Sequence, residues 1–298
     1  MSLKHIVKLP WWARMRAKLV LSRLPVSYRF WQRMQLFQHG LMEDPAYAWN
    51  IFRNHWDAVG LKFGSEGFRS LEMGPGDTLF SALIAYAYGC RITYLVDVGE
   101  FARHDIPPYH AMSKFLAGRG MHTADIRQAK TLEDIVASTR AEYLTQGLES
   151  LRTIPDSSVD FIWSNAVLEH IRRSEFLDIM IETRRILKPG GAISHQVDLR
   201  DHLGGALNNL RFTQEEWESD RMSSAGFYTN RIRYNEMLAM FVQAGFHVEV
   251  DHRDIWEQLP TPRSKMQPEF ASIDEFDLRV MGFAVVLTPE KGDSNTGG

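Results

Sequence analysis

Cysteine is almost missing from this 298-residue sequence: the single residue, Cys90, allows no internal disulfide. One thiol without a partner is typical of proteins from a reducing cytoplasm. Long apolar stretches are also absent, since no uninterrupted run approaches the roughly 20 residues that a membrane-spanning helix needs. The first residues lack an uncharged apolar segment followed by a small-residue cleavage site, so we expect no secretory signal. These absences predict a cytoplasmic protein.

Acidic residues are absent from the first 42 positions, which hold eight Lys or Arg. The rest of the chain carries 26 basic and 37 acidic residues, a net charge of −11. In WWARMRAKLVLSRL, residues 11–24, Trp12, Met15 and Leu19 recur at helical spacing among cations. This pattern predicts peripheral contact with an anionic membrane. A helical lid over the cofactor site is the alternative.

Four segments differ in pattern. We expect a helical, basic and aromatic extension over residues 1–60 and a catalytic α/β domain over 61–289, with an irregular acceptor-side insertion at 201–231 and a disordered tail at 290–298. Over residues 68–200, short apolar runs alternate with helical patterns, which predicts βαβ units and a parallel sheet. The last two expected strands have no helix between them and suit an antiparallel pair. The expected strands lie at 68–73, 91–98, within 141–147, at 159–166, 191–199, 247–254 and 277–288.

A glycine-rich turn follows the first expected strand. In LEMGPGDT the strand ends at Glu72, and Gly74 and Gly76 then allow a tight turn and a close approach of backbone to ligand. About twenty residues later Asp97 ends the second strand, where a carboxylate can accept hydrogen bonds from both hydroxyls of a ribose. A dinucleotide site shares this geometry but would want a third glycine, and Thr78 stands in that stretch instead.

Four motifs in series narrow the choice. LEMGPGDT, LVDV, IPDSSVDFIWSNAVLEHI and RRILKPGGAI together resemble class I S-adenosylmethionine-dependent methyltransferases, of the group related to quinone methyltransferases. The resemblance implies a Rossmann-like, seven-stranded methyltransferase sheet and S-adenosylmethionine as cofactor. It also implies a set of cofactor-binding residues. Glu72, Gly74 and Gly76 would surround the methionine part together with Asn165. Asp97 would hold the ribose, and the backbone at 147–149 would face the adenine. The set is Glu72, Gly74, Gly76, Asp97, Val98, Leu148 and Asn165.

Two histidines and two aspartates follow one another in SHQVDLRDHLGG, residues 194–205. Ligands in open α/β sheets bind beyond the carboxyl ends of the strands, and this segment leaves the fifth strand at that edge. We therefore predict catalytic roles for His195 and Asp198, together with His170 from LEHI, in deprotonating or orienting an acceptor hydroxyl. The alternative is a buried His195 with its hydrogen bonds satisfied and an Asp201 that caps a helix. A divalent-metal site made from His195, Asp198, Asp201 and His202 is a further alternative, although we expect no metal.

The acceptor is predicted from residues 168–231, which resemble methyltransferases encoded with surface-polysaccharide genes. That resemblance implies O-methylation of a sugar hydroxyl in a surface glycan or a lipid-linked glycan precursor, at the inner face of a membrane. Amides and guanidinium groups beside aromatic rings in 206–231 suit such a pocket. The alternatives are a quinone or other small aromatic acceptor, a nucleic acid, or a cofactor-binding protein without chemistry. We do not expect a nucleic-acid partner, because the body of the protein is acidic.

Overall fold

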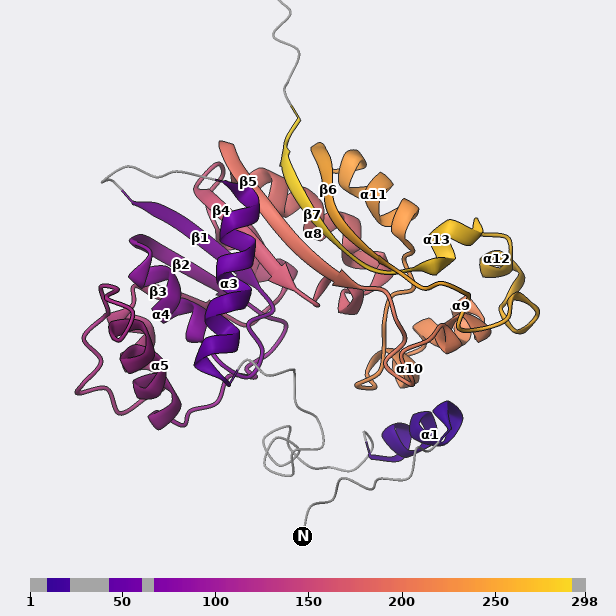
Figure 1. The fold of residues 1–298 in the computed structure, drawn as a ribbon, viewed down its shortest axis with the longest axis horizontal. Helices are drawn as coiled ribbons and strands as arrows, with labels where there is room; N and C mark the ends of the chain where they lie inside the picture. The colour runs from indigo at the N-terminus through magenta and orange to yellow at the C-terminus, as the bar shows by residue number, and fades with distance from the viewer. Residues whose placement is uncertain (1–9, 22–42, 61–66, 291–298) are drawn as a thin grey trace, which may run out of the picture.

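Seven strands form one sheet through the centre of the computed structural model, which describes residues 10–21, 43–60 and 67–290 (Figure 1). The strand order is β3-β2-β1-β4-β5-β7-β6. The first five strands in the chain run parallel, whereas β7 is antiparallel to both β5 and β6. The strands are β1 (Phe68–Met73), β2 (Cys90–Val96), β3 (Ala141–Leu144), β4 (Val159–Asn165), β5 (Leu187–Asp198), β6 (Phe246–Ile255) and β7 (Val280–Pro289). The expected Rossmann-like seven-stranded methyltransferase sheet is confirmed.

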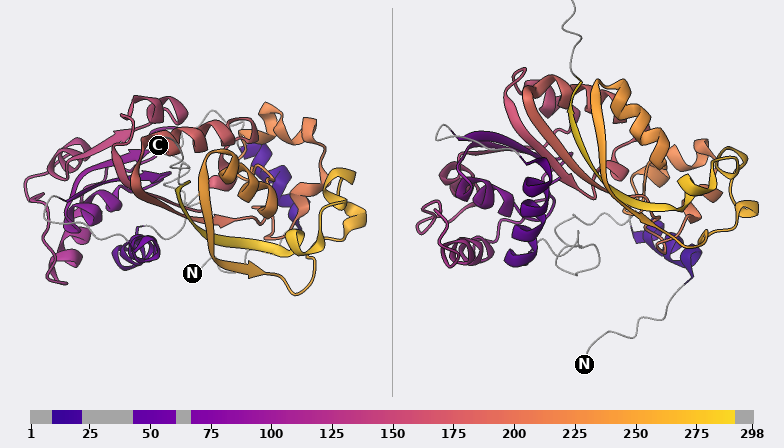
Figure 2. Two further views of the ribbon diagram at one scale, coloured as in Figure 1. Left: turned by 90° about the horizontal axis from the view of Figure 1, so that it is seen from above. Right: turned by 45° about the horizontal axis from the view of Figure 1, so that its top comes forward.

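Helices cover both faces of the sheet (Figure 2). One face carries α3 (Pro45–Val59), α4 (Phe80–Ala87), α5 (Pro107–Ala117) and α6 (Leu132–Ser138). The other carries α7 (Leu148–Thr153), α8 (Arg173–Ile186) and α11 (Tyr234–Gln243). Successive strand residues point to opposite faces, so Phe161 and Trp163 enter one core while Ile162 enters the other. Burial on both faces explains why these strands read as continuous apolar runs.

Helix α3 packs directly on the sheet. Asp44 caps its first turn by accepting from the Tyr47 N–H, and Gly60 ends it in the left-handed conformation at φ 59°. Phe52 is fully buried and meets Phe161 and Trp163 edge to face, with ring centroids 6.0 and 5.8 Å apart. Helix α3 belongs to the predicted extension over residues 1–60, yet it packs on the sheet of the predicted domain over 61–289.

A lobe beyond the sheet is built from two excursions of the chain. The first follows β5, as the predicted insertion does, and holds η2 (Asn208–Arg211), α9 (Gln214–Glu218) and α10 (Asp220–Ser223). The second lies between β6 and β7 and holds η3 (Arg263–Lys265), α12 (Pro268–Ala271) and α13 (Glu275–Arg279). Leu207 and Leu210 of the first pack with Phe270 and Leu278 of the second. The two excursions therefore share a core of their own.

Helix α1 (Trp11–Leu21) lies against this lobe rather than against the sheet (Figure 1). Leu19 is buried among lobe residues that include Trp217 and Phe227, and Trp11 meets the ring of Phe212 at 6.2 Å. In the described segments, no helix combines the length and the apolar character needed to cross a membrane. The predicted tail at 290–298 lies outside the described residues apart from Glu290.

Candidate active site

The loop after β1 folds tightly against the end of β2. Gly74 has φ +68°, and a Cβ built on it would lie 2.6 Å from the side chain of Val167, so glycine is required there. Its N–H donates to the carbonyl of Val96 at 2.8 Å. The Gly76 N–H donates to Asp97 Oδ2 at 3.1 Å. The glycine turn and Asp97 are therefore held together as one unit at the carboxyl ends of neighbouring strands.

Glu72, the last but one residue of β1, lies inside the protein. Its side chain accepts a hydrogen bond from Ser81 Oγ of α4 and the residue is only 3% exposed. Burial raises the pKa of its carboxyl to about 8, with the Ser81 hydroxyl opposing the shift and the Asp97 charge adding to it. A cationic ligand beside Glu72 would favour the ionised form. The sulfonium and ammonium groups of S-adenosylmethionine meet that requirement.

Next to Asp97 the surface changes from polar to apolar. Asp97 Oδ1 accepts from the Val98 N–H at 2.8 Å, while the side chain of Val98 is 75% exposed. The Gly147 N–H donates to the Asp97 carbonyl at 2.8 Å, and a Cβ on Gly147 would lie 3.2 Å from Val98 Cγ1. Leu148 begins α7 at the same place. A carboxylate beside an exposed apolar side chain suits a ribose that carries a flat base, so these residues fit the predicted cofactor.

Sequence reasoning missed His55 of α3. Its Nδ1 lies 2.8 Å from Ser194 Oγ of β5, and it hydrogen-bonds the side chain of Asn165 at the end of β4. The ring is buried against Trp163, with centroids 5.1 Å apart. Burial lowers the pKa of His55 to about 4, more than the Asn165 bond raises it. The bland helical pattern of residues 45–59 carries no signal for this contact, which links the predicted cofactor residue Asn165 to the N-terminal helix.

The structure places His195 in the core rather than at the site's edge. The side chain shares a face of β5 with Ile193 and Val197, as the strand alternation predicts. Its Nδ1 lies 2.7 Å from Ser164 Oγ, and its ring is stacked on Phe241 of α11 with centroids 6.2 Å apart. The residue is fully buried, which lowers its pKa to about 3. The imidazole that was predicted to be catalytic is thus buried where water and an acceptor do not reach it in this structure.

Asp198 and Asp201 serve different purposes at the end of β5. Asp198 accepts from Arg200 Nε at 2.9 Å and Nη2 at 2.8 Å, and these bonds lower its pKa although burial alone would raise it. Asp201 accepts from the backbone N–H groups of Leu203, Gly204 and Asn208. Asp201 therefore caps the exit loop, while Asp198 remains an ionised side chain at the edge of the sheet.

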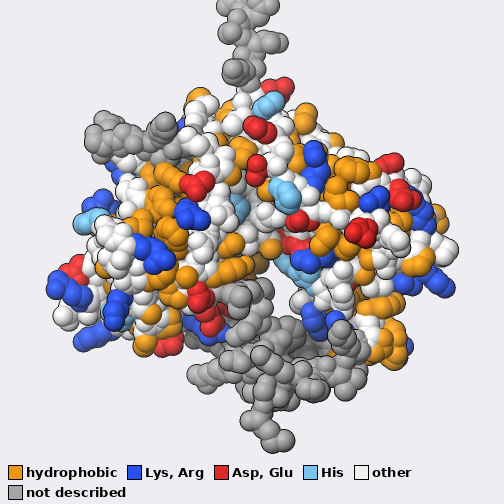
Figure 3. Space-filling model, in the orientation of Figure 1, with side chains coloured by type: hydrophobic (Ala, Val, Ile, Leu, Met, Phe, Trp, Pro, Cys, Tyr) orange, Lys and Arg blue, Asp and Glu red, His pale blue; other side chains and the backbone are white. Residues whose placement is uncertain are grey.

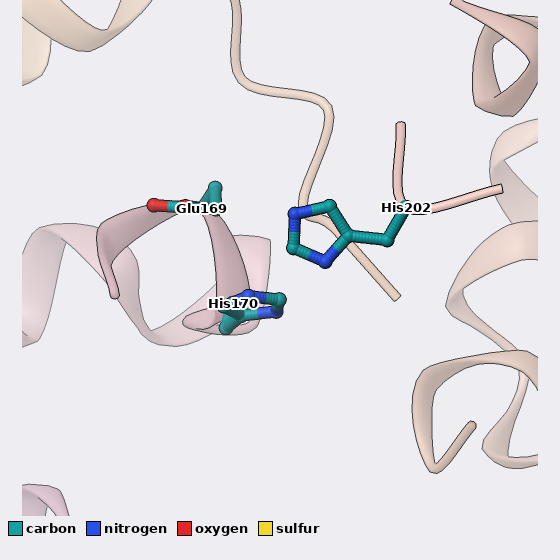
Figure 4. A group of neighbouring side chains, drawn as sticks. All are labelled: Glu169, His170 and His202. Carbon is teal, nitrogen blue, oxygen red and sulfur yellow. The ribbon is translucent and has the colours of Figure 1, made fainter. Parts of the chain in front are cut away.

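Three side chains meet at this edge of the sheet, and Figure 4 shows Glu169 and His170 on one segment and His202 on another. Glu169 and His170 lie in η1 (Leu168–His170) after β4, and His202 lies in the loop after β5. The two imidazole rings have centroids 4.7 Å apart. Glu169 is 2% exposed, and burial raises its pKa well above the usual value, helped by the Asp198 charge and opposed by nearby backbone N–H groups and Arg200. The structure thus joins predicted residue His170 to Glu169, which sequence reasoning missed.

Most polar residues predicted for an acceptor pocket instead hold the lobe together. Trp217 Nε1 donates to the Thr229 carbonyl at 2.7 Å, and Arg231 Nη1 donates to the Phe212 carbonyl at 2.7 Å. Asn230 Nδ2 donates to the carbonyls of Leu168 and Ile171 at 2.8 and 2.9 Å. These buried side chains position η1 and the lobe. Figure 3 shows a hollow between the sheet and the lobe, with acidic and histidine side chains beside it.

Helix α1 is joined to the same region by its cations. Arg14 Nη1 donates to the Leu203 carbonyl at 3.2 Å, and Lys18 Nζ donates to the His202 carbonyl at 3.3 Å. Within the described residues α1 covers the loop that carries His202, while residues 22–42, the rest of the segment for which a lid was the alternative, lie outside them. Its opposite side leaves Trp12 49% and Val20 63% exposed.

Comparisons with known proteins agree with this geometry. Residues 111–194 match the family model described as a methyltransferase domain. With the observed sheet, this match makes the protein an enzyme of methyl transfer, and its cofactor is S-adenosylmethionine. No curated protein matches the sequence.

Solved structures in which the chain follows a similar course include three proteins of low sequence identity. An S-adenosylmethionine-dependent methyltransferase from Archaeoglobus fulgidus is 11% identical, with 88% of this chain and 99% of that one covered and a TM-score of 0.45. The YcgJ protein of Bacillus subtilis is 16% identical, with 80% and 100% covered and a TM-score of 0.42. The phosphoethanolamine N-methyltransferase 2 of Haemonchus contortus, solved with S-adenosylhomocysteine, is 13% identical, with 82% and 53% covered and a TM-score of 0.41.

Proposed function

We propose that this methyltransferase O-methylates a sugar hydroxyl of a surface glycan or a lipid-linked glycan precursor. One observation carries the proposal: the edge beside the methyl-donor site is polar. Glu169, Asp198, Arg200 and the imidazoles of His170 and His202 gather there. Hydroxyl groups need hydrogen-bond acceptors and donors of this kind, whereas a quinone or another flat aromatic acceptor would need an apolar wall.

The predicted cofactor residues divide the work of binding. When bound, S-adenosylmethionine supplies an electrophilic methyl group on a sulfonium. Glu72 offers a carboxylate to the cationic part, Asp97 accepts from the ribose hydroxyls, and Val98 with the 147–148 backbone covers the adenine. Asn165, held by His55, lines the methionine end. Gly74 and Gly76 both have positive φ, and their turn lets the backbone approach the cofactor without a clashing side chain.

On the acceptor side, Asp198 is the side chain best placed to act on a hydroxyl. Its pKa is lowered, so it is ionised at neutral pH and can accept a hydrogen bond from the acceptor. His170 borders the same edge. His195 is assigned a positioning role, since it contacts Ser164 and Phe241 inside the core. Methyl transfer requires mainly that donor and acceptor be held in line, which this division allows.

We place the enzyme in the cytoplasm, at the inner face of a membrane. Support comes from the exposed side of α1, where Trp12 and Val20 are accompanied by Arg16, whose guanidinium lies 5.5 Å from the Trp12 ring. Apolar side chains with cations between them suit a surface of anionic lipids. A polyprenyl-linked glycan would meet the acceptor edge from that surface.

The test is methyl transfer from labelled S-adenosylmethionine to a panel of acceptors. The panel holds nucleotide sugars, polyprenyl-linked glycans, a quinone precursor and RNA. We expect label on a sugar-containing acceptor, and Asp198→Asn to lower turnover by about 10²–10⁴ with little change in cofactor affinity. Labelling of the quinone precursor or of RNA alone would replace the glycan proposal with that acceptor.

A further inference from the structure

The buried carboxylate of Glu169 lies next to the imidazoles of His170 and His202. No side chain among the described residues donates a hydrogen bond to either buried oxygen of Glu169, and the backbone N–H groups of Glu169 and Asp198 lie near the carboxylate but outside hydrogen-bond geometry. Buried acidic groups are normally paired, because an unpartnered carboxylate loses its hydration without compensation. The ligand atoms of Glu169, His170 and His202 all lie within 4.8 Å of one another. A partner for the Glu169 carboxylate at this position would therefore also contact the two imidazoles.

We propose that Glu169, His170 and His202 bind one divalent transition-metal ion. Two imidazole nitrogens and one carboxylate oxygen suit Mn²⁺, Fe²⁺, Co²⁺ or Zn²⁺ better than Mg²⁺ or Ca²⁺, which prefer oxygen ligands throughout. Three protein ligands also leave coordination positions for water or for an incoming hydroxyl. This set differs from the one considered from the sequence, since His195 is in the core and Asp201 caps a loop.

His170 is held in the orientation that a metal ligand needs. Its Nδ1 lies 2.9 Å from the Tyr228 carbonyl, which can only accept, so Nδ1 carries the proton. Nε2 is then the nitrogen with the lone pair. Metal-binding histidines commonly donate their other ring N–H in this way, which fixes the tautomer and the ring plane.

Both backbone segments that carry the ligands are fixed in advance. The Asn230 N–H donates to the Glu169 carbonyl at 2.7 Å, and the Asn230 side chain donates to the carbonyls of Leu168, the first residue of η1, and of Ile171, which follows it. On the opposite segment, Asp201 accepts from the N–H groups that follow His202, whose own carbonyl accepts from Lys18. Binding an ion would therefore require little ordering of the chain.

The neighbouring cationic side chains, Arg200 and Lys18, do not pair with the Glu169 carboxylate in place of a metal ion. Arg200 is paired with Asp198 through two hydrogen bonds, and Lys18 Nζ is directed at the carbonyls of His202 and Gly226. Neither cation makes a hydrogen bond to Glu169. A divalent ion between Glu169 and the imidazoles would balance the buried carboxylate.

The ion would lie beside Asp198, at the edge assigned to the acceptor. There it would bind one or two hydroxyl oxygens of a sugar and hold them for methyl transfer. This catalytic part of the inference rests on the proposed function, whereas the binding of the ion does not. The two parts can therefore be tested separately.

The binding test uses the full-length, tag-free protein after treatment with a chelator. Titration with Co²⁺ should produce visible absorption bands that saturate at one ion per chain, and Zn²⁺ should displace it. Glu169→Gln and His202→Ala should each weaken Co²⁺ binding at least tenfold, or about 1.4 kcal/mol. His252→Ala is the matched control, since His252 is an exposed histidine beside Asp254, and should bind as the wild type does.

Folding and function are read independently. In chelator all variants should bind S-adenosylhomocysteine as the wild type does, and excess Zn²⁺ should raise the melting temperature of the wild type and the control but not of Glu169→Gln. No saturable Co²⁺ binding, or equal binding by Glu169→Gln and His202→Ala, would overturn the site. Metal binding without label on any sugar overturns only the proposed acceptor, and sugar labelling that persists in chelator overturns only the catalytic part.

Discussion

Replacing Glu72 by Gln should remove the loss of stability that this carboxyl causes in the cofactor-free enzyme as pH rises towards about 8. The folded protein retains the Glu72 proton up to a pKa of about 8, whereas the unfolded chain loses it near 4.5. Between these values the unfolded state binds fewer protons, so stability falls as pH rises and levels off above about 8. The full difference corresponds to about 5 kcal/mol, at about 1.4 kcal/mol for each pH unit.

The assay is urea unfolding of the two proteins from pH 5 to pH 9 without cofactor. Glu72→Gln keeps the hydrogen bond from Ser81 and cannot ionise, so its stability should exceed that of the wild type by several kcal/mol at pH 9 and by little at pH 5. Glu142→Gln, an exposed position on neighbouring β3, is the control and should follow the wild type. Parallel curves for Glu72→Gln and the wild type would refute the reasoning.

The same substitution should act on the cofactor in the opposite sense. A cationic ligand favours ionised Glu72, so S-adenosylmethionine should bind more tightly to the wild type as pH rises through about 8. Glu72→Gln should bind more weakly at high pH and show no such dependence. Calorimetry across the same pH range measures both effects. Cofactor affinity that is equal in the two proteins would remove Glu72 from the cofactor site.

Three further outcomes follow from the described geometry. Asp97→Ala should weaken S-adenosylmethionine binding by calorimetry about tenfold or more, or about 1.4 kcal/mol, whereas exposed Asp125→Ala should not. Buried His195 stays neutral down to a pKa of about 3, whereas the unfolded chain gains this proton near 6.5, so the wild type should lose stability as pH falls between these values. His195→Gln should make that loss smaller. An unchanged loss of stability in urea unfolding at acid pH would contradict this. Full-length protein should co-sediment with anionic vesicles at low salt and be released at high salt, and Trp12→Ser should weaken it; no sedimentation would leave α1 as part of the lobe alone.

Local patterns were sufficient for the sheet and for the glycine turn after β1. Strand β1 has the predicted bounds, and β2 and β4 differ by one or two residues at their ends, because buried parallel strands leave continuous apolar runs in the sequence. The glycine turn was readable for a similar reason, since positive φ and close packing at Gly74 depend on its immediate neighbours and on one contact with Val167. Asp97 was placed by its position at a strand end.

The direction and depth of single side chains were decided by tertiary packing. Period-two alternation put His195 on the correct face of β5, but only the position of α11 shows that this face is closed there by Phe241. The pairing of His55 with Ser194 joins residues 139 positions apart and has no sequence signal. Helix α1 was predicted as a helix, yet its surface on the lobe depends on the fold of residues 201–231.

The sequence by itself determined the positions of most strands, the glycine turn and the placement of Glu72 and Asp97 at strand ends. Each of these features depends on residues close together in the chain. Only the tertiary structure brought Glu169 and His170 next to His202, since β4 and β5 are neighbours whose carboxyl ends open at one edge. It also left the Glu169 carboxylate without a hydrogen-bonding side chain among the described residues, a property that no pattern of residues encodes. Burial and partnership are set by what packs around a side chain, and for this acceptor edge that packing comes from η1, the exit loop of β5 and α1 together.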